Sequence, residues 1–309
     1  MKVLVKTNGM AREEWLRWRR MGIGGSDASV IAGVNKFRSI FQLWMEKTGQ
    51  EEPGEAESEY AHFGTVLEPV VKKEFTARTG LKVRSRRAIL QSEEHPFMLA
   101  DLDGVINENG EMCVFEAKTA SAYKLETWEG GVPLEYLYQV QHYMAVTGAK
   151  KTYIAALVGG SRFIYHEVFR DEKMISEIIQ MEKEFWEKYV LGGTEPPADG
   201  SEATTRFLDG KYRVSSGGSI ELPAEALPLC EQYEEISNQL KELGKQKDEA
   251  ANKIKNYLKG NETGIVGGRK ITWKPVVSTT FDKKGLEKEH KDIYEKYCRK
   301  SQYRRLSIA

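Results

Sequence analysis

The spacing of hydrophobic residues predicts an alternation of helices and strands along the first two thirds of the chain. Residues 12–20 and 135–146 are expected to be helical, and apolar side chains also recur at helical spacing between residues 60 and 78. Pro69 lies inside this last stretch, where it removes one internal hydrogen bond and disfavours helical geometry at Glu68. We therefore expect a half-buried helix that starts or kinks at Pro69.

Apolar runs separated by turn residues predict two β-hairpins and a long helix after them. The turns are expected at residues 107–110, which read Asn-Glu-Asn-Gly, and at Gly159-Gly160. The helix is expected to stop at Gly192-Gly193. The four strands and the helix are predicted over residues 97–106, 112–119, 152–158, 161–169 and 171–191.

A change of composition predicts the end of the first domain. Pro196-Pro197 follows the long helix, and a stretch rich in Gly and Ser comes next. We expect a core over residues 1–195, a linker over 196–222 and a C-terminal module over 223–309.

The module begins with a regular hydrophobic seam. From Leu229 to Tyr257 apolar residues follow alternating steps of four and three positions, interrupted only by Lys247. This spacing predicts a coiled-coil-like helix that packs on one partner, either another chain or the core. A strand around 270–277 and a final helix over 282–299 would complete a small α+β module.

Charge gives no global sign of a nucleic-acid partner. Lys and Arg together number 46, as do Asp and Glu, so the formal net charge is zero. Any DNA binding must come from local basic clusters, such as Arg84, Arg86 and Arg87. Each cluster alone is more simply a solvated face.

Cysteine usage and the absence of long apolar runs indicate the compartment. Cys113, Cys230 and Cys298 are far apart and odd in number, so they predict neither a disulfide framework nor a zinc site. The first residues are too short in apolar length for a signal peptide, and no later run is long enough to span a bilayer. We expect a soluble protein in a reducing, cytoplasmic setting, without a membrane partner.

A glycine-rich loop over residues 22–27 precedes a short predicted helix, for which Ser26 or Asp27 is a suitable N-cap. Such a loop can hold a phosphate on backbone N–H groups, and Arg19 and Arg20 would add charge. It lacks the Lys-Ser/Thr ending of a P-loop. A tight turn with a capped helix explains the same residues about equally well.

The strongest chemical signal is Asp103 followed by Glu116-Ala117-Lys118. On a strand Glu116 and Lys118 project from the same face, while Ala117 points away. Two carboxylates favour Mg²⁺ or Mn²⁺, and a nearby ammonium can position the water that attacks a phosphodiester. Asp101 shares the predicted strand face with Asp103, so spacing alone does not decide between them, although Gly104 favours Asp103.

Two further candidates have equally simple structural explanations. Glu68 follows Thr65 at the spacing of a capping box, in which it would only bind the backbone of the helix start. Gln139 and Tyr143 are four residues apart on a predicted helix, so both could face a phosphate or a catalytic water. They could equally be packing residues.

Together, five motifs in a fixed order resemble the lambda-type phage exonucleases, the YqaJ-like viral recombinase family of the PD-(D/E)XK nuclease superfamily. The resemblance covers roughly residues 15–169. The motifs are Arg-Met-Gly-Ile-Gly-Gly-Ser-Asp at 20–27, Gly-x-x-x-Glu at 64–68, Asp-Gly at 103–104, Glu-Ala-Lys at 116–118 and Gln-Val-Gln-His-Tyr at 139–143.

The resemblance implies a fold and a reaction. The fold would be α/β (α+β), with a central mixed β-sheet flanked by helices in a restriction-endonuclease-like core. The reaction would be 5′-to-3′ digestion of linear double-stranded DNA, dependent on Mg²⁺ or Mn²⁺, leaving 3′ overhangs for phage-type recombination by single-strand annealing. Two metal ions are implied.

The resemblance also assigns roles. Asp103, Glu116 and the Ala117 carbonyl would bind metal, and Glu68 would help with a second ion. Lys118 would act on the attacking water, with Gln139 supporting the site and Tyr143 near the DNA. Ser26 and either Arg19 or Arg20 would receive the terminal 5′ phosphate.

Partners follow from the same resemblance. Family members form rings around DNA, often trimeric, and work with a single-strand annealing protein, so a homo-oligomer of phage or prophage origin in a bacterial cytoplasm is implied. Related nucleases carry an iron–sulfur cluster on four cysteines, but three scattered cysteines argue against one here.

Two alternative functions remain compatible with the sequence. An endonuclease on the same site would cut covalently closed circular DNA, which an exonuclease would not. A DNA-binding recombination adaptor would have an inert site, but the retention of Asp103, Glu116 and Lys118 together speaks against decay.

Overall fold

The computed structural model describes residues 1–50, 59–299 and 303–308. The chain divides into two compact units, Met1–Gly210 and Lys211–Ala309, and the division falls inside the range predicted as a linker. Each unit is described by itself. No helix of the described residues is long and apolar enough to cross a membrane.

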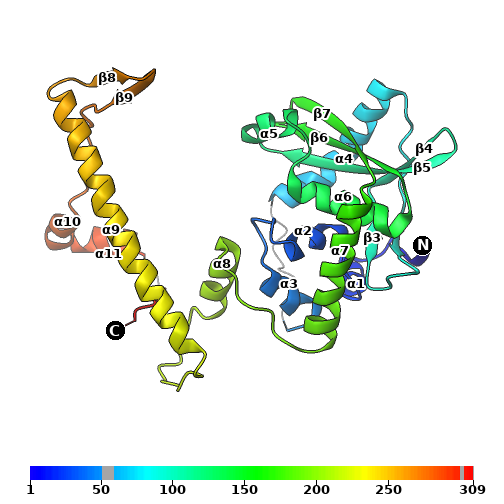
Figure 1. The fold of residues 1–309 in the computed structure, drawn as a ribbon, viewed down its shortest axis with the longest axis horizontal. Helices are drawn as coiled ribbons and strands as arrows, with labels where there is room; N and C mark the ends of the chain where they lie inside the picture. The colour runs from blue at the N-terminus through cyan, green and yellow to red at the C-terminus, as the bar shows by residue number, and fades with distance from the viewer. Residues whose placement is uncertain (51–58, 300–302, 309) are drawn as a thin grey trace. The chain divides into compact units, whose positions relative to one another are not determined.

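A four-stranded mixed sheet forms the centre of the first unit (Figure 1). Its strands run in the order β4-β5-β6-β7, with β5 and β6 parallel and both outer pairs antiparallel. The strands are β4 Gly104–Glu108, β5 Glu111–Ala120, β6 Lys151–Val158 and β7 Arg162–Phe169. The predicted mixed sheet is confirmed, and both predicted turns join strands of this sheet.

A second, three-stranded antiparallel sheet has the order β1-β2-β3. Its strands are β1 Lys2–Lys6, β2 Ala88–Gln91 and β3 Leu99–Asp101. The single strand predicted over 97–106 is therefore wrong. It breaks at Leu102-Asp103, so that β3 and β4 belong to different sheets and Asp103 lies in the connection between them.

Helices cover both faces of the mixed sheet. On one face α4, Glu59–Thr79, packs Val71 and Phe75 against Phe115 of β5, with the two phenyl centroids 4.9 Å apart. On the other face α6, Leu134–Thr147, packs Val140 and Met144 in the cluster that holds Val114 and Ile154. Because successive strand residues point to opposite faces, β5 contributes to both cores.

The sequence predicted that helix α4 starts or kinks at Pro69, and the first of these two alternatives is wrong. The described part of α4 begins ten residues earlier, at Glu59, and continues through Pro69 to Thr79. The burial of Val71 and Phe75 beyond the proline offsets the lost backbone hydrogen bond.

A third cluster closes the unit around Phe41, Trp44 and Phe185. Trp44 donates its indole N–H to the Tyr189 carbonyl at 2.9 Å, and Phe41 packs on Phe207, inside the range predicted as a linker. The remaining helices of the unit are α1 Arg12–Arg20, α2 Gly25–Ile31, α3 Ile40–Lys47, a 3₁₀ turn at Ala122–Lys124, α5 Leu125–Glu129, α7 Glu172–Glu184, a π-helical turn Phe185–Leu191 and α8 Glu202–Lys211.

The second unit contains the long helix that the seam predicts, α9, over Ala226–Leu258. A hairpin of β8, Thr263–Val266, and β9, Arg269–Thr272, follows it. The final helix predicted over 282–299 is divided at His290 into α10, Lys283–Glu289, and α11, Lys291–Tyr297.

Candidate active site

Asp103 is held directly against the Glu-Ala-Lys triplet of β5. Its Oδ2 accepts a hydrogen bond from the Ala117 N–H at 2.8 Å. The next residue, Gly104, pairs with Phe115, and a Cβ at Gly104 would come within 2.5 Å of Val83 Cγ1. Glycine is required there by close packing, which also fixes Asp103 beside β5.

Glu116 lies at the centre of a buried polar cluster. Its Oε1 accepts from Lys118 Nζ at 2.7 Å and from Gln139 Nε2 at 2.7 Å. Its Oε2 is buried and has no hydrogen-bond partner among the residues that the structure describes. Glu116 is only 3% exposed, so this second oxygen is a desolvated acceptor without compensation.

Burial and a nearby carboxylate, Glu116 for Asp103 and Glu68 for Glu116, disfavour the ionised form of both groups. Burial raises the pKa of Asp103 well above its ordinary range, and the charge of Glu116 raises this pKa further. Burial also raises the pKa of Glu116, against the opposing effect of Lys118. A ligand that supplies positive charge would favour the ionised forms of both groups.

Gln139 connects the carboxylate to the rest of the site. From α6 it donates to Glu116 and to the Tyr143 hydroxyl, at 3.0 Å, and its Oε1 accepts from Lys118 Nζ at 3.0 Å. Lys118 also lies over the Tyr136 ring, 4.8 Å from its centroid. Burial disfavours the ammonium, but Glu116 and Asp103 outweigh this effect and raise the pKa of Lys118. Lys118 is therefore a charged donor in this arrangement.

The capping-box explanation for Glu68 is wrong, because Thr65 lies inside α4 rather than at its start. The Thr65 hydroxyl donates to the Ala61 carbonyl at 3.2 Å. Glu68 forms an ion pair with Lys72 one turn later, and both side chains line the same cavity as Asp103 and Glu116.

Asp101 has a different environment from Asp103. Its Oδ2 accepts the indole N–H of Trp15 at 2.6 Å. Burial raises the pKa of Asp101, partly opposed by this hydrogen bond. It thus has a structural partner on α1, whereas Asp103 contacts β5.

The cavity has a volume of about 620 Å³ and joins the carboxylates to the glycine-rich loop. Its walls come from α1, α2, α4, α6 and both sheets. The lining includes Trp15, Arg19, Gly24, Gly25, Ser26, Thr65, Glu68, Lys72, Arg86, Arg87, Asp101, Asp103, Glu116, Gln139 and Tyr143.

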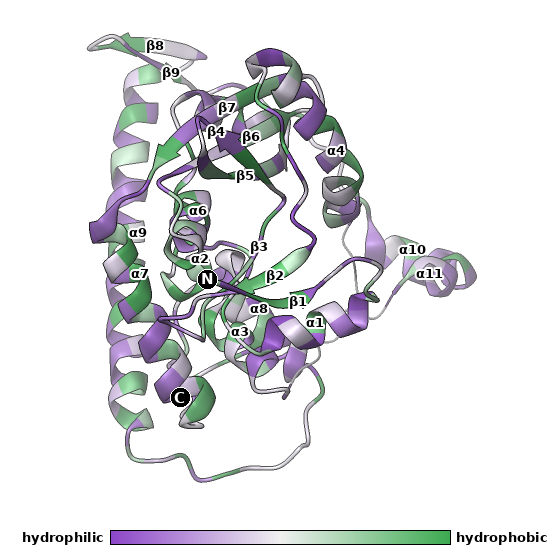
Figure 2. Cartoon of the chain, turned by 90° about the vertical axis from the view of Figure 1, so that its right-hand side faces the viewer, coloured by the Kyte–Doolittle hydropathy of each residue, from purple (hydrophilic) through white to green (hydrophobic). Residues whose placement is uncertain are grey.

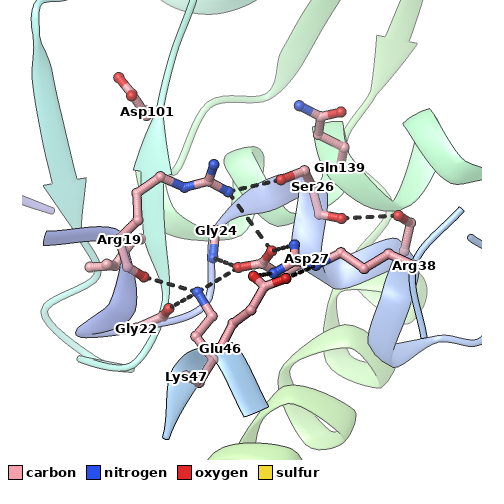
Figure 3. A network of polar contacts seen from close by, with 12 residues as sticks. Arg19, Gly22, Gly24, Ser26, Asp27, Arg38, Glu46, Lys47, Asp101 and Gln139 are labelled. Atoms are coloured by element: carbon pink, nitrogen blue, oxygen red, sulfur yellow. Dashed lines mark hydrogen bonds and ion pairs between the residues drawn. The ribbon is translucent and has the colours of Figure 1, made fainter. Parts of the chain in front are cut away.

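Arg19, rather than Arg20, stands with Ser26 in this cavity. Arg19 Nη2 donates to Ser26 Oγ at 3.0 Å, and its guanidinium lies over the Trp15 ring, 4.9 Å from the centroid. Figure 3 shows the arginine reaching across to the serine. The two side chains are thus hydrogen-bonded to each other in the lining of the cavity that also holds Asp103 and Glu116.

The predicted N-cap residues of α2 are wrong by two or three positions. The N-cap is Gly24, and Asp27 lies at the third helical position, where its Oδ2 accepts from the Gly24 N–H at 3.0 Å. Gly25 packs so closely on Tyr143 that a Cβ would overlap the tyrosine ring. Gly25 therefore serves close packing against α6, and Gly22 serves close packing against Phe97 and Leu99.

Asp27 also anchors a buried ionic network that the sequence did not indicate (Figure 3). It binds Lys47 at 2.7 Å and Arg38 at 2.9 Å, and Arg38 also pairs with Glu46. Lys47 donates to the Arg19 carbonyl at 2.9 Å and to the Gly22 carbonyl at 2.7 Å. No spacing rule joins these residues, because the loop between α2 and α3 brings them together.

The electrostatics of this network are opposite to those of Asp103. Burial alone would raise the pKa of Asp27, but Lys47, Arg38 and Arg19 outweigh it and hold this pKa far below its ordinary value. Through its hydrogen bonds to the Arg19 and Gly22 carbonyls, Lys47 fixes the backbone at the end of α1, which carries Arg19. The network is a support for the arginine and serine pair.

The carboxylates of the site would supply some, but not all, of the ligands of a hard divalent cation. No group of three or more His, Cys, Asp or Glu side chains within the described ranges is arranged to hold a metal ion. Asp103, Glu116 with its unsatisfied oxygen, and the nearby Glu68 offer carboxylate oxygens, which Mg²⁺ and Mn²⁺ prefer. Such an ion usually keeps waters or binds substrate phosphate as well, so these residues fit it.

Comparisons with known proteins agree on a family. Residues 14–150 match the model of the YqaJ-like viral recombinase domain. The chain is 44% identical over 311 residues to the uncharacterized protein YqaJ of Bacillus subtilis (strain 168), covering 99% of this chain and 97% of that protein. The crystal structure of an alkaline exonuclease from Laribacter hongkongensis has a similar fold, with a TM-score of 0.50, 20% identity, and coverage of 58% of this chain and 93% of that one.

Proposed function

The chain belongs to the YqaJ-like viral recombinase family, and from this premise we propose that it is a metal-dependent exonuclease. It would digest linear double-stranded DNA from 5′ ends and leave 3′ single strands. The observation that carries the proposal is one cavity lined both by Asp103 and Glu116 and by the hydrogen-bonded Arg19 and Ser26.

Lys118 and Gln139 would position the attacking water. An ammonium has three donors, and two of those on Lys118 are directed to Glu116 and Gln139. The third is available for a water or a phosphate oxygen. Gln139 fixes this geometry, since its amide binds Glu116 with one end and Lys118 with the other.

Asp103 and Glu116 would hold Mg²⁺ or Mn²⁺ together with the Ala117 carbonyl, and Glu68 would serve a second ion. Such ions lower the pKa of bound water and stabilise charge on phosphate oxygens. The support is the unsatisfied Glu116 Oε2 and the unfavourable charge environment of Asp103. Added Mg²⁺ should therefore raise the melting temperature of the wild type but not that of Glu116→Gln.

Arg19 and Ser26 would bind the terminal 5′ phosphate, and Tyr143 would lie between this phosphate and the carboxylates. A guanidinium binds phosphate through paired hydrogen bonds, which suits recognition of a chain end. A role in recombination with a single-strand annealing protein, and assembly into a ring around DNA, complete the proposal.

The deciding experiment compares linear duplexes labelled at the 5′ or the 3′ end, with Mg²⁺, for wild type and Lys118→Ala. We expect early release of the 5′ label by the wild type and loss of this activity in the variant. Lys150→Ala is the matched control, because Lys150 is exposed and pairs only with Glu111 in the described structure. Equal activity of wild type and Lys118→Ala would refute the role of Lys118.

The same assay separates the alternatives. Cutting of covalently closed circular DNA would indicate an endonuclease. Linear DNA that stays intact with Mg²⁺ and with Mn²⁺, but is bound, would favour a recombination adaptor with an inert site.

A further inference from the structure

Within the described part of the second unit, helix α9 presents an apolar seam whose side chains are largely exposed. Leu229, Leu240 and Leu243 are 64%, 64% and 59% exposed, and Ile236 is 46% exposed. In Figure 2 hydrophobic and hydrophilic positions alternate turn by turn along α9. A helix of 33 residues is about 50 Å long, so the seam is far larger than a scattered surface residue.

The seam follows a heptad in which the flanking positions carry almost no charge. Positions a are Tyr233, Leu240, Lys247 and Ile254, and positions d are Leu229, Ile236, Leu243, Ala250 and Tyr257. The e positions are small, namely Cys230, Ser237, Gly244 and Ala251, and the g positions are Gln232, Gln239, Gln246 and Lys253. Charged residues occupy mainly the b, c and f positions, on the far face.

A parallel pair of these helices would be poorly matched. Lys247 would face Lys247 of the second copy inside the seam, and like charges repel there. Ala250 would face Ala250 of the second copy, which leaves a void, and each tyrosine would face the same tyrosine of the second copy.

An antiparallel pair resolves each of these conflicts in one register. When the two-fold axis passes between Lys241 and Glu242, Tyr233 faces Ala250 of the second copy and Ala226 faces Tyr257. Leu240 then faces Leu243, and Leu229 faces Ile254. Each tyrosine thus meets an alanine, the leucines meet leucine or isoleucine, and this register covers nearly the full helix.

The flanking positions fit the same arrangement. Along one side Ser237 faces Gly244 and Cys230 faces Ala251, so the two backbones can approach closely. Along the other side Gln239 faces Gln246. In the seam itself, Lys247 faces Ile236 and lies away from Lys247 of the second copy. Two identical helices therefore meet without charge repulsion, as a two-fold interface requires.

We propose that α9 forms an antiparallel two-helix coiled coil with α9 of a second copy of this chain. Self-complementarity favours a second copy over an unrelated partner, because the same register satisfies both helices along their whole length. This assembly is independent of the nuclease proposal. It would join two copies through their second units.

The register can be tested with one introduced cysteine in the full-length protein. In a Cys298→Ser background, Ala251→Cys should form an intermolecular disulfide with the native Cys230 of a second copy. The two positions lie about 30 Å apart along one helix, so a link within one chain is impossible. The matched control is the same variant with Cys230→Ser, which should lose the link between positions 230 and 251.

Peptide mass spectrometry after mild oxidation identifies the linked pair. A disulfide between Cys230 and the cysteine introduced at position 251 supports the antiparallel register. A link only between two Cys230 residues, or as little dimer as in the control, overturns the proposal.

A second variant tests the seam without oxidation. Leu243→Glu should halve the mass measured by sedimentation, whereas Lys245→Glu, on the charged face, should leave it unchanged. An unchanged mass with a lower melting temperature would mean that the seam packs on the chain's own first unit, and the proposal would fail.

Discussion

The first unit contains two buried clusters of charge that are built in opposite ways. Around Asp27, three cations surround the carboxylate, and the pKa of Asp27 is held far below its ordinary value. Around Asp103 and Glu116, burial is compensated chiefly by Lys118, and one carboxylate oxygen has no hydrogen-bond partner in the described chain. The first cluster is electrostatically complete, whereas the second is suited to receiving a cation.

The largest effect, a loss of nuclease activity, should come from removing one carboxylate charge at the second cluster. Glu116→Gln keeps the shape of the side chain but removes a proposed metal ligand, so nuclease activity should fall by at least about 100-fold. The protein should remain about as stable as the wild type, because the loss of an unfavourable buried charge offsets the loss of the ion pair with Lys118. Release of the 5′ label measures the activity, and urea unfolding measures the stability. Glu111→Gln, at an exposed position, is the control for both. Full activity in Glu116→Gln would remove Glu116 from the site.

The equivalent change at the first cluster should act on stability. Asp27→Asn leaves Lys47 and Arg38 buried without their shared anion, and breaking a buried pair typically costs about 3–5 kcal/mol. The free energy of unfolding in urea measures this loss. Asp103→Asn is the matched control and should show no such loss. Equal stability of the two variants would contradict the contrast between the clusters.

A smaller effect is expected at the arginine that the first cluster supports. Arg19→Ala should reduce the preference for 5′-phosphorylated over 5′-hydroxyl ends by about 10-fold or more, since hydrogen bonds to charged groups contribute roughly 1.5–3 kcal/mol. The ratio of kcat/KM for the two ends is the measurement. Arg17→Ala, an exposed neighbour on α1, should keep the preference. A preference that survives in Arg19→Ala would assign phosphate recognition elsewhere.

The smallest effect is the pH dependence, which should have opposite signs at the two aspartates. The lowered pKa of Asp27 contributes stability that is fully present above about pH 3.8 and declines below it as the unfolded chain takes up protons. The raised pKa of Asp103 contributes stability below pH 3.8 that is lost as pH rises through the folded value.

Urea unfolding between pH 3 and pH 8, without added metal, tests both signs. The deficit of Asp27→Asn should shrink in acid, while the advantage of Asp103→Asn should grow from pH 4 upward. Parallel stability profiles for wild type and both variants would refute these assignments.

Local patterns predicted most of the elements but only part of the site. The periodicity around Phe75, Gln139 and Leu240 placed α4, α6 and α9, because each helix carries its own apolar spacing. The break at Leu102-Asp103 was not predicted, since both sides of it have strand-like residues. Only pairing with two different sheets reveals it.

The Asp27 network shows why the rest could not be predicted. Arg38 and Lys47 lie 11 and 20 positions from Asp27, on a loop and on a different helix, and no periodic spacing relates them. Likewise, the sequence could not predict that Arg19 contacts Ser26, because this depends on the direction of a side chain. The sequence could not exclude a helix cap for Glu68, because it did not predict that α4 already includes Glu59.

Helix α6 contributes two residues one turn apart, Gln139 and Tyr143, to the lining of the cavity. Tyr143 packs on Gly25 beside the arginine and serine pair, and Gln139 binds Glu116. If the proposed function is right, this single helical turn sets the distance between the bound DNA end and the bond that is cut. We therefore expect the length of the released fragment to be constant and independent of base sequence, because it is measured by backbone geometry.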